Sequence, residues 1–190
     1  MKKFLSICLL GLLLDNMTIA LADDNDQQPL WRQVSFPLEK FTRYSSRFGW
    51  RKMGGQKEFH SGLDMPAPSG SPLRAWASGQ VVSASYDNRC GKHITVVSGD
   101  WRSTFCHMSA LVVQTGQLVE AGQIVGAVGS TGRSTGPHLH WTLRYQSRLV
   151  NPELVIQAMQ LAWQGQSVPV VSPAEEVPDD AQNSLLPIGP

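Results

Sequence analysis

The segment HLHWTLRY at residues 138–145 indicates most clearly which fold this chain adopts. On a β-strand alternate residues face the same side, so His138 and His140 point one way, about 6.7 Å apart along the strand. The leucines and the tryptophan at alternating positions point the other way. On a helix the two histidines would lie about 200° apart. The segment therefore predicts a strand with one apolar face and one face that carries two imidazoles.

The surrounding sequence has the same character. From 36 to 150 the chain is dense in Gly and in short β-branched or aromatic runs, with turns every 8–12 or so residues, which is typical of an all-β domain. SGDW at 98–101 predicts a hairpin turn, and Asn151-Pro152-Glu153 predicts the start of a helix that runs to about Trp163. The other predicted strands are QVVSAS (80–85), HITVVS (93–98), TFCHM (104–108) and QIVGAV (123–128).

The ends of the chain predict a leader and a tail. Lys2 and Lys3, an apolar run from 4 to 14 and the small residues of Ala20-Leu21-Ala22 are typical of a secretory signal peptide at 1–22. The apolar run is shorter than the ~20 residues that a membrane span needs, so no stable membrane insertion is expected after cleavage. A polar segment (23–35), the main domain (36–165) and a disordered, Pro-rich acidic tail (166–190) are expected to follow.

Export bears on the cysteines and on the charge. Cys8 belongs to the leader, and the remaining pair, Cys90 and Cys106, predicts a disulfide in an oxidising compartment. A two-cysteine metal site is the alternative, although the pair lacks CxxC spacing. The formal charge is +1 overall, but 30–168 carries 14 Lys and Arg against 7 Asp and Glu, which suits an anionic polymer. Without a run of basic residues, nucleic-acid binding is not expected.

Four of the five histidines fall in three short motifs: HSGLD (60–64), FCHM (105–108) and GPHLHW (136–141). His60 and Asp64 are too far apart on a straight strand to share an ion easily, but Gly62 can supply a bend between them. A histidine, a carboxylate and a second histidine make a three-ligand set for catalytic zinc, with a position left open for water. Two histidines then remain for proton transfer and transition-state stabilisation. His93 matches no motif and is expected to be structural.

The ordered motifs resemble the lysostaphin/LytM-like zinc endopeptidases, which cut peptidoglycan peptides. The resemblance covers about 41–152 and rests on YSSRFGWR (44–51), FHSGLDMPAPSGSPLRAWASGQVV (59–82), CHM (106–108) and AGQIVGAVGSTGRSTGPHLHW (121–141). It implies a compact antiparallel β-sandwich of the duplicated hybrid motif type with an open groove over one zinc ion. Carried over to this chain, it implies the zinc ligands His60, Asp64 and His140 and the catalytic residues His107 and His138.

In that family a zinc-activated water attacks the peptide carbonyl. The resemblance gives His138 the role of general base and gives His107 the role of holding the oxyanion or orienting the water. We expect His107 to reach the groove because it shares strand parity with Phe105. Phe105 replaces a tyrosine usual in the family, and Thr142 stands where an acid is common, so we expect altered substrate preference or rate.

Arginines are the candidate substrate-binding residues, since they could bind substrate carboxylates: Arg47, Arg51 and Arg133. The expected function is a secreted zinc metalloendopeptidase acting on peptidoglycan cross-links or stem peptides, in the periplasm or outside the cell. The alternatives are a non-catalytic peptidoglycan-binding or hydrolase-activating protein on the same scaffold and a peptidase of Gly-rich proteins. The sequence identifies neither the bond cut nor a protein partner.

Overall fold

A computed structural model of the protein describes residues 33–41, 43–174 and 177–183. The predicted signal peptide at 1–22 and nearly all of the polar segment lie outside these ranges. Within them, no helix combines the length and the apolar character needed to cross a membrane.

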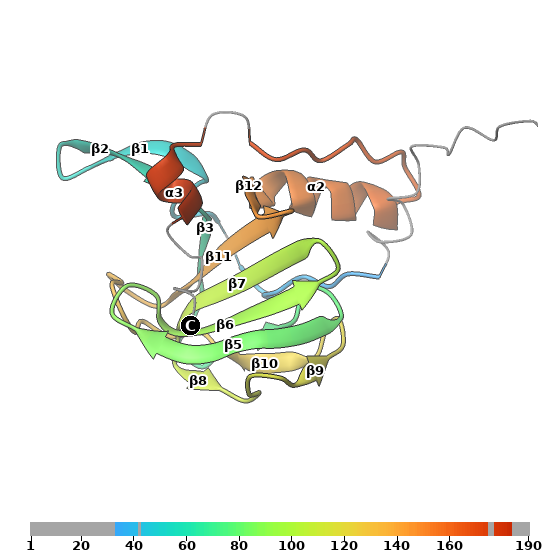
Figure 1. Ribbon diagram of the computed structural model, residues 1–190, viewed down its shortest axis with the longest axis horizontal. Coiled ribbons are helices and arrows are strands. Elements are labelled where there is room, and N and C mark those ends of the chain that lie inside the picture. The colour runs from blue at the N-terminus through green and yellow to red at the C-terminus, as the bar shows by residue number, and fades with distance from the viewer. Residues whose placement is uncertain (1–32, 42, 175–176, 184–190) are drawn as a thin grey trace, which may run out of the picture.

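Strands dominate the described part of the chain, and most of them are antiparallel neighbours in sheets (Figure 1). The mainly β fold predicted from the sequence is confirmed. The strands are β1 (Gly49–Met53), β2 (Gln56–His60), β3 (Leu63–Pro66), β4 (Pro72–Arg74), β5 (Gly79–Asp87), β6 (Gly91–Ser98), β7 (Trp101–Met108), β8 (Ala110–Leu111), β9 (Leu118–Val119), β10 (Ile124–Ala127), β11 (His138–Tyr145) and β12 (Arg148–Val150).

A large sheet, with strand order β12-β11-β7-β6-β5-β9, is extended by β3, which pairs with the first half of β11. A small sheet of β4, β10 and β8 packs against it, and β1 and β2 form a hairpin beyond β3 (Figure 1). The core between the sheets contains Trp76 and Trp141, each about 1% exposed or less, with ring centroids 6.2 Å apart. This packing of two antiparallel layers is the predicted sandwich.

Strand β11 is the centre of the fold and alternates as its sequence predicts. Leu139, Trp141 and Leu143 are fully buried in the core, whereas His138 and His140 point away from it and are partly exposed. One edge of the first half of β11 pairs with β3 and the other edge pairs with β7. The histidine-bearing face is therefore held between two strands that come from distant parts of the sequence.

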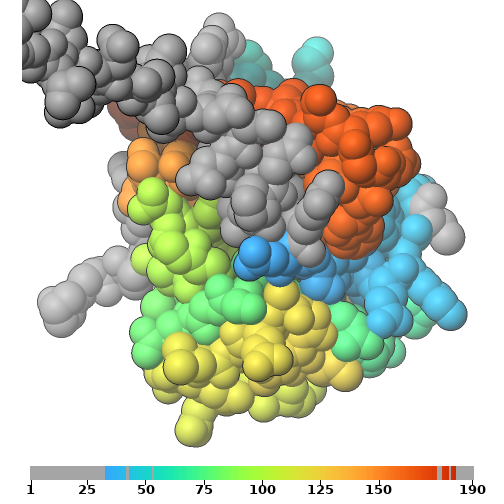
Figure 2. Space-filling view, turned by 90° about the vertical axis from the view of Figure 1, so that its right-hand side faces the viewer, coloured from blue at the N-terminus to red at the C-terminus, as the bar shows by residue number. Residues whose placement is uncertain are grey.

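Helix α2 (Pro152–Trp163) begins where the sequence predicts. The side chain of Asn151 caps it by accepting a hydrogen bond from the Glu153 amide at 3.0 Å. Its apolar face is buried, and the chain segment at 33–38 passes between α2 and the strands below it (Figure 2). There Phe36 makes an edge-to-face contact with Trp163, with ring centroids 5.0 Å apart. Val34, which lies just before the predicted start of the domain at 36, is buried as well.

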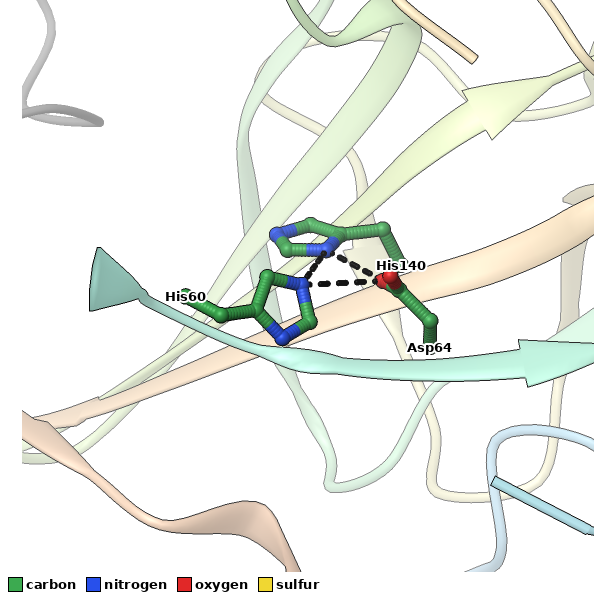
Figure 3. A group of neighbouring side chains, drawn as sticks. All are labelled: His60, Asp64 and His140. Carbon is green, nitrogen blue, oxygen red and sulfur yellow. Dashed lines mark hydrogen bonds and ion pairs between the residues drawn. The ribbon is translucent and has the colours of Figure 1, made fainter. Parts of the chain in front are cut away.

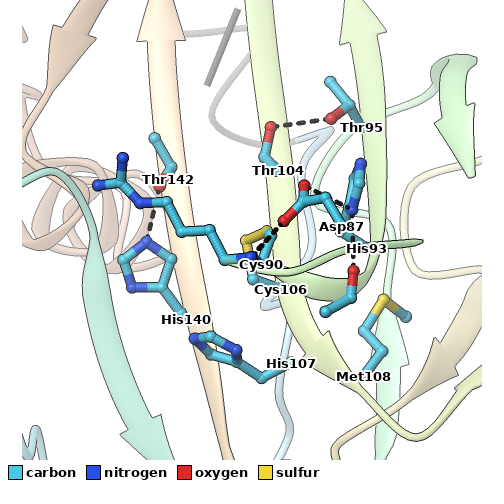
Figure 4. The surroundings of a disulfide bond; sticks show 12 residues. Asp87, Cys90, His93, Thr95, Thr104, Cys106, His107, Met108, His140 and Thr142 are labelled. Carbon is cyan, nitrogen blue, oxygen red and sulfur yellow. Dashed lines mark hydrogen bonds and ion pairs between the residues drawn. A yellow bond between two sulfur atoms is a disulfide. The ribbon is translucent and has the colours of Figure 1, made fainter. Parts of the chain in front are cut away.

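Cys90 and Cys106 are joined in the structure, with their Cα atoms 4.9 Å apart (Figure 4). Cys90 lies just before β6 and Cys106 lies near the end of β7. The β6–β7 hairpin brings these positions to the same end, as its predicted turn requires. Both cysteines are buried, and both border the groove described below.

The tail differs from its prediction over the residues that the structure describes. Val171 and Ala181 are buried, and the Ala174 amide donates a hydrogen bond to the Leu149 carbonyl at 2.9 Å. Within the tail the short helix α3 (Asp179–Asn183) lies near the β1–β2 hairpin (Figure 1). Its Gln182 side chain accepts a hydrogen bond from the Leu149 amide at 3.1 Å. The acidic, Pro-rich composition predicts disorder, but the free edge of β12 offers backbone partners that composition does not reveal.

Candidate metal centre and catalytic groove

Three strands bring His60, Asp64 and His140 together (Figure 3). His60 is the last residue of β2, Asp64 is the second residue of β3, and His140 is the third residue of β11. Asp64 and His140 are direct partners in the β3–β11 register, so their side chains lie on the same face of the sheet. The pairing of two strands 76 residues apart in sequence thus places a carboxylate beside an imidazole.

Gly62 lies at the bend between β2 and β3, where the sequence predicts one. Besides allowing the bend, Gly62 is needed because it lacks a Cβ atom. A Cβ atom at this position would lie 2.7 Å from Cε1 and 2.8 Å from Nε2 of His140, and 2.7 Å from the Trp141 carbonyl oxygen. The backbone of Gly62 therefore packs directly against the His140 imidazole, in space that no side chain can share.

The donor atoms of the three side chains converge on one point. His60 Nε2 lies 3.2 Å from Asp64 Oδ1, His140 Nδ1 lies 2.7 Å from the same oxygen, and the two nitrogens are 3.1 Å apart. Three donors around a tetrahedral zinc ion, each about 2.0–2.1 Å from it, would be separated by about 3.3 Å. The donor set and its spacing fit zinc with only a slight outward movement.

Hydrogen bonds on the far side of the His60 ring support this arrangement. His60 Nδ1 donates to the Arg47 carbonyl oxygen at 2.8 Å, which leaves Nε2 as the unprotonated nitrogen that faces the centre. The Arg47 segment is held there because the adjacent Ser46 forms an antiparallel bridge with Asp64. Sequence reasoning missed this support, because nothing in the local pattern shows that residues 45–47 pair with β3.

His107 lies on the same face as the metal centre, but not because it shares strand parity with Phe105, as the sequence predicted. Phe105 pairs with Trp141 and has no exposed surface, so a regular strand would place His107 in the core as well. Instead the β6–β7 register shifts before Met108, and His107 adopts a φ of 61°. This left-handed conformation breaks the alternation and turns the imidazole towards the metal centre.

His107 and His138 form a second pair of imidazoles beside the metal centre. Their ring centroids are 4.7 Å apart, and His138 Nε2 lies 3.7 Å from Asp64 Oδ1. His107 Nδ1 donates to the Thr131 carbonyl at 2.8 Å, and His138 Nδ1 donates to the Gly136 carbonyl at 2.7 Å. Each neutral ring therefore keeps Nε2 free to accept a proton or a hydrogen bond.

Burial and mutual contact alter the ionisation of the centre. Burial lowers the pKa of His140 to about 4, although its hydrogen bond with Asp64 acts in the opposite direction. Burial alone would raise the pKa of Asp64, but hydrogen bonds with His140 and His60 outweigh it and hold that pKa well below its ordinary value. Burial also lowers the pKa of His107. At neutral pH His140 is therefore neutral and Asp64 is ionised, which are the states that bind a metal.

The lowered pKa of His140 predicts a pH-dependent stability for the metal-free protein. The unfolded chain binds a proton on this histidine near pH 6.5, whereas the folded chain does so only near pH 4. The unfolded state thus binds more protons in this window, and stability should fall as pH falls from 6.5 to 4, by about 3 kcal/mol from His140. The lowered pKa of His107 acts in the same direction. Asp64 contributes little between pH 6.5 and 4, because its pKa in the folded protein lies below the ordinary value of 3.8 and the carboxyl is mostly ionised in both states in this window.

Urea unfolding at a series of pH values, with a chelator present, measures this dependence. The His140→Gln variant should show a flatter curve between pH 6.5 and 4 than the unaltered protein. Equal slopes for the two proteins would contradict the assignment of this proton uptake to His140.

The three candidate zinc ligands and the two candidate catalytic histidines lie in one groove with a volume of about 600 Å³. We call these residues, His60, Asp64, His107, His138 and His140, the five candidate residues. Basic side chains outnumber acidic ones along the groove. The half-exposed Trp50 lies at its rim, where Lys57 Nζ is 4.3 Å from the centroid of the indole ring. The groove is lined by Trp50, Arg51, Lys57, Glu58, Phe59, His60, Ser61, Asp64, Arg89, Cys90, Cys106, His107, Gly132, Arg133, Ser134, Thr135, His138, His140, Pro178 and Ala181.

The three arginines predicted to bind substrate have different positions. Arg133 lines the groove, and Arg51 does so while bonded to Glu58 at 2.8 Å and to Ser46. Arg47 is not among the lining residues, and its guanidinium pairs with Glu153 instead. Sequence reasoning missed Arg89, which lines the groove beside Arg133 because the Arg133 amide donates to its carbonyl at 2.9 Å.

A second group of potential ligands, Asp87, Cys90 and His93, lies on the far side of the disulfide (Figure 4). Cys90 is joined to Cys106 and offers no thiolate, and the Asp87 carboxylate accepts hydrogen bonds from the amides of residues 89 and 90. His93 is bonded to Ser83 and Ser85, as expected for a structural residue. We assign no metal to this group.

Comparison with known proteins identifies the family. Residues 58–152 match the model of peptidase family M23, a span that contains all five candidate residues. The chain belongs to peptidase family M23. The resemblance inferred from the motifs is therefore confirmed.

Sequence relatives in the M23 family include peptidoglycan hydrolases. The chain is 37% identical over 134 residues to the DD-carboxypeptidase/endopeptidase Mpg of Neisseria meningitidis, covering 68% of this chain and 31% of the relative. It is 34% identical over 147 residues to the peptidoglycan DD-endopeptidase ShyC of Vibrio cholerae, covering 75% and 34%. The chain thus spans about a third of the length of these curated relatives.

Solved M23 structures share the fold. A zinc-containing peptidase from Vibrio cholerae aligns with a TM-score of 0.60 at 29% identity, covering 63% of this chain and 39% of the other. The catalytic domain of lysostaphin from Staphylococcus simulans aligns with a TM-score of 0.56 at 32% identity, covering 60% and 92%. The second alignment includes almost the whole of a catalytic domain, which confirms the predicted likeness of the antiparallel β fold to the lysostaphin/LytM-like enzymes.

Proposed function

We propose that this M23 protein is a zinc DD-endopeptidase that hydrolyses peptide cross-links of peptidoglycan. The observation that carries the proposal is the convergence of His60 Nε2, Asp64 Oδ1 and His140 Nδ1 within 3.2 Å of one another beside two further imidazoles. The relatives named as DD-endopeptidases support the choice of substrate.

His60, Asp64 and His140 would hold one zinc ion. When bound, zinc supplies a Lewis acid and makes a water molecule acidic near neutral pH. Two neutral imidazoles and one carboxylate leave a net positive charge on such a site, and the lowered pKa values of Asp64 and His140 favour these protonation states. Arg51 Nη1 lies 3.7 Å from Asp64 Oδ2, on the oxygen that does not face the histidines, and would help to orient the carboxylate.

His138 would act as the general base. Its Nε2 is unprotonated while Nδ1 donates to the Gly136 carbonyl, so it can take a proton from the attacking water and pass it to the leaving amine. His107 has the same protonation pattern through Thr131, so its neutral form accepts a hydrogen bond and orients the water. Once one of the two rings is protonated, it can stabilise the developing oxyanion.

The rim of the groove suits an anionic peptide. Lys57, Arg89 and Arg133 line it, and peptidoglycan peptides carry free carboxylates. We assign Arg89 and Arg133 to carboxylate binding and exclude Arg47, which is paired with Glu153 outside the groove.

The site of action would be the periplasm, after removal of residues 1–22. The signal-like leader and the buried Cys90–Cys106 pair both suit an oxidising compartment outside the cytoplasm. The substrate is found in the same place.

Digestion of purified, cross-linked muropeptide dimers tests the proposal, with products identified by mass. The zinc-loaded protein should convert dimers to monomers with the gain of one water. A chelator should abolish the conversion, and added zinc should restore it. Asp64→Asn, which keeps the shape of the side chain but removes its charge, should be inactive. Intact dimers after incubation with zinc-loaded protein would contradict the proposal.

A further inference from the structure

Thr142 is buried next to His140 (Figure 4). By alternation along β11 it lies on the same face of the strand as His138 and His140. The residue is 1% exposed, and its Oγ1 lies 3.1 Å from His140 Nε2. The other ring nitrogen, Nδ1, is the one that faces Asp64 and His60. The hydroxyl thus lies on the side of the ring opposite the proposed zinc.

A neutral imidazole carries one proton, and only its unprotonated nitrogen can bind a metal. For His140 to bind zinc through Nδ1, the proton must be on Nε2. The carboxylate of Asp64 opposes this arrangement in the metal-free protein, because at 2.7 Å it is a good acceptor for a proton on Nδ1. A hydrogen-bond acceptor at Nε2 is therefore needed to favour the tautomer that binds zinc.

The surroundings leave little choice of acceptor. The Gly62 backbone covers the edge of the ring that contains Cε1 and Nε2, and a single added carbon there would lie within 2.8 Å of Nε2. The Gly62 backbone therefore occupies one side of the ring beside Nε2, and the Thr142 hydroxyl is the side-chain oxygen that lies within hydrogen-bond distance of this nitrogen. The Thr142 hydroxyl can rotate about its Cβ–Oγ1 bond, so its oxygen can accept from Nε2–H.

We propose that Thr142 is a positioning residue that accepts the His140 Nε2–H bond and thereby fixes Nδ1 as the zinc-binding nitrogen. The inference rests on the proposed zinc centre, and it gives a role to a residue whose type departs from the acid common at this position in the family. Contacts of this kind typically change metal affinity 10- to 100-fold. The shorter contact of His60 Nδ1 is with the Arg47 backbone carbonyl at 2.8 Å, against 3.3 Å to the Ser46 hydroxyl, whereas the contact of His140 Nε2 is with the Thr142 side chain.

The test measures zinc affinity by competition with a chromophoric chelator. Thr142→Val, which keeps the shape but removes the hydroxyl, should weaken zinc binding about 10- to 100-fold, whereas Thr142→Ser should stay within about threefold of the unaltered protein. The matched control is Thr104→Val. Thr104 is the buried cross-strand partner of Thr142, and its hydroxyl bonds to Thr95 at 3.0 Å instead of to a histidine. It should leave zinc affinity unchanged.

Imidazole ¹⁵N NMR of the metal-free protein gives a second readout that a purely structural role would not alter, because without zinc the tautomer of His140 depends on its hydrogen-bond acceptors. The proton of neutral His140 should lie on Nε2 to a larger extent in the unaltered protein and in Thr142→Ser than in Thr142→Val. Equal zinc affinity for Thr142→Val and Thr104→Val would overturn the role of Thr142 while leaving the proposed function intact. Failure of the unaltered protein to bind zinc would overturn both.

Discussion

Replacing either His107 or His138, the two groove histidines outside the proposed zinc ligands, should lower the rate of cross-link hydrolysis roughly 10²- to 10⁴-fold while zinc stays bound. His107→Gln and His138→Gln each remove an imidazole that directs Nε2 into the groove, and neither ring supplies a donor to the metal centre. Because the two rings lie 4.7 Å apart and serve one reaction, the double variant should lose much less than the product of the single effects.

The measurement is kcat on muropeptide dimers together with zinc content per chain. His93→Gln is the matched control, because His93 bonds to Ser83 and Ser85 and does not line the groove. It should retain activity within about twofold. A His138→Gln variant with full activity would remove this residue as general base, and loss of zinc from either groove variant would mean that the two sets of histidines have been assigned incorrectly.

Gly62→Ala should cost the protein its metal centre. The added Cβ would meet the His140 ring and the Trp141 carbonyl at 2.7–2.8 Å, and the carbonyl cannot move without disturbing the β3–β11 pairing. We expect zinc affinity to fall at least about 100-fold, with a loss of about 1–3 kcal/mol in the free energy of unfolding from overpacking. Activity should fall with zinc occupancy.

Gly136→Ala is the control for this substitution. Gly136 belongs to the neighbouring GPHLHW motif, but nothing lies within 4 Å of a Cβ built there. Zinc titration and urea unfolding of the two variants should separate them clearly. A Gly62→Ala protein that binds zinc like Gly136→Ala would show that the His140 ring does not need this space.

The parts of the site predicted from sequence are those whose geometry is local. The period of two in HLHWTLRY places His138 and His140 on one face, and Gly62 marks the bend between His60 and Asp64. The hairpin turn at 98–101 brings Cys90 and Cys106 together for the same reason. In each case spacing along one or two adjacent elements was sufficient to predict the arrangement.

The parts that sequence reasoning missed depend on long-range pairing or on unusual backbone conformation. His107 enters the groove through a positive φ, and no residue type near it signals that conformation. The Arg47 carbonyl supports His60 only because Ser46 bridges to Asp64. Arg89 lies beside Arg133 in the groove because the Arg133 amide, in another loop, donates a hydrogen bond to the Arg89 carbonyl.

Phe105 and Thr142 illustrate the same limit. The expectation that Phe105 alters substrate preference finds no support in its position, since it is fully buried against Trp141 and does not line the groove. Thr142 contacts a proposed metal ligand instead of the substrate groove. A departure from a family pattern can be seen in the sequence, but its effect depends on what the side chain touches.

The most direct test of the account is a zinc titration of the metal-depleted protein, with bound zinc and dimer hydrolysis followed in the same samples. We expect activity to be absent without metal, to rise in proportion to bound zinc and to reach its maximum at one zinc per chain. The Asp64→Asn variant should neither bind zinc tightly nor gain activity. Hydrolysis by the metal-free protein, or full zinc binding by Asp64→Asn, would contradict these expectations.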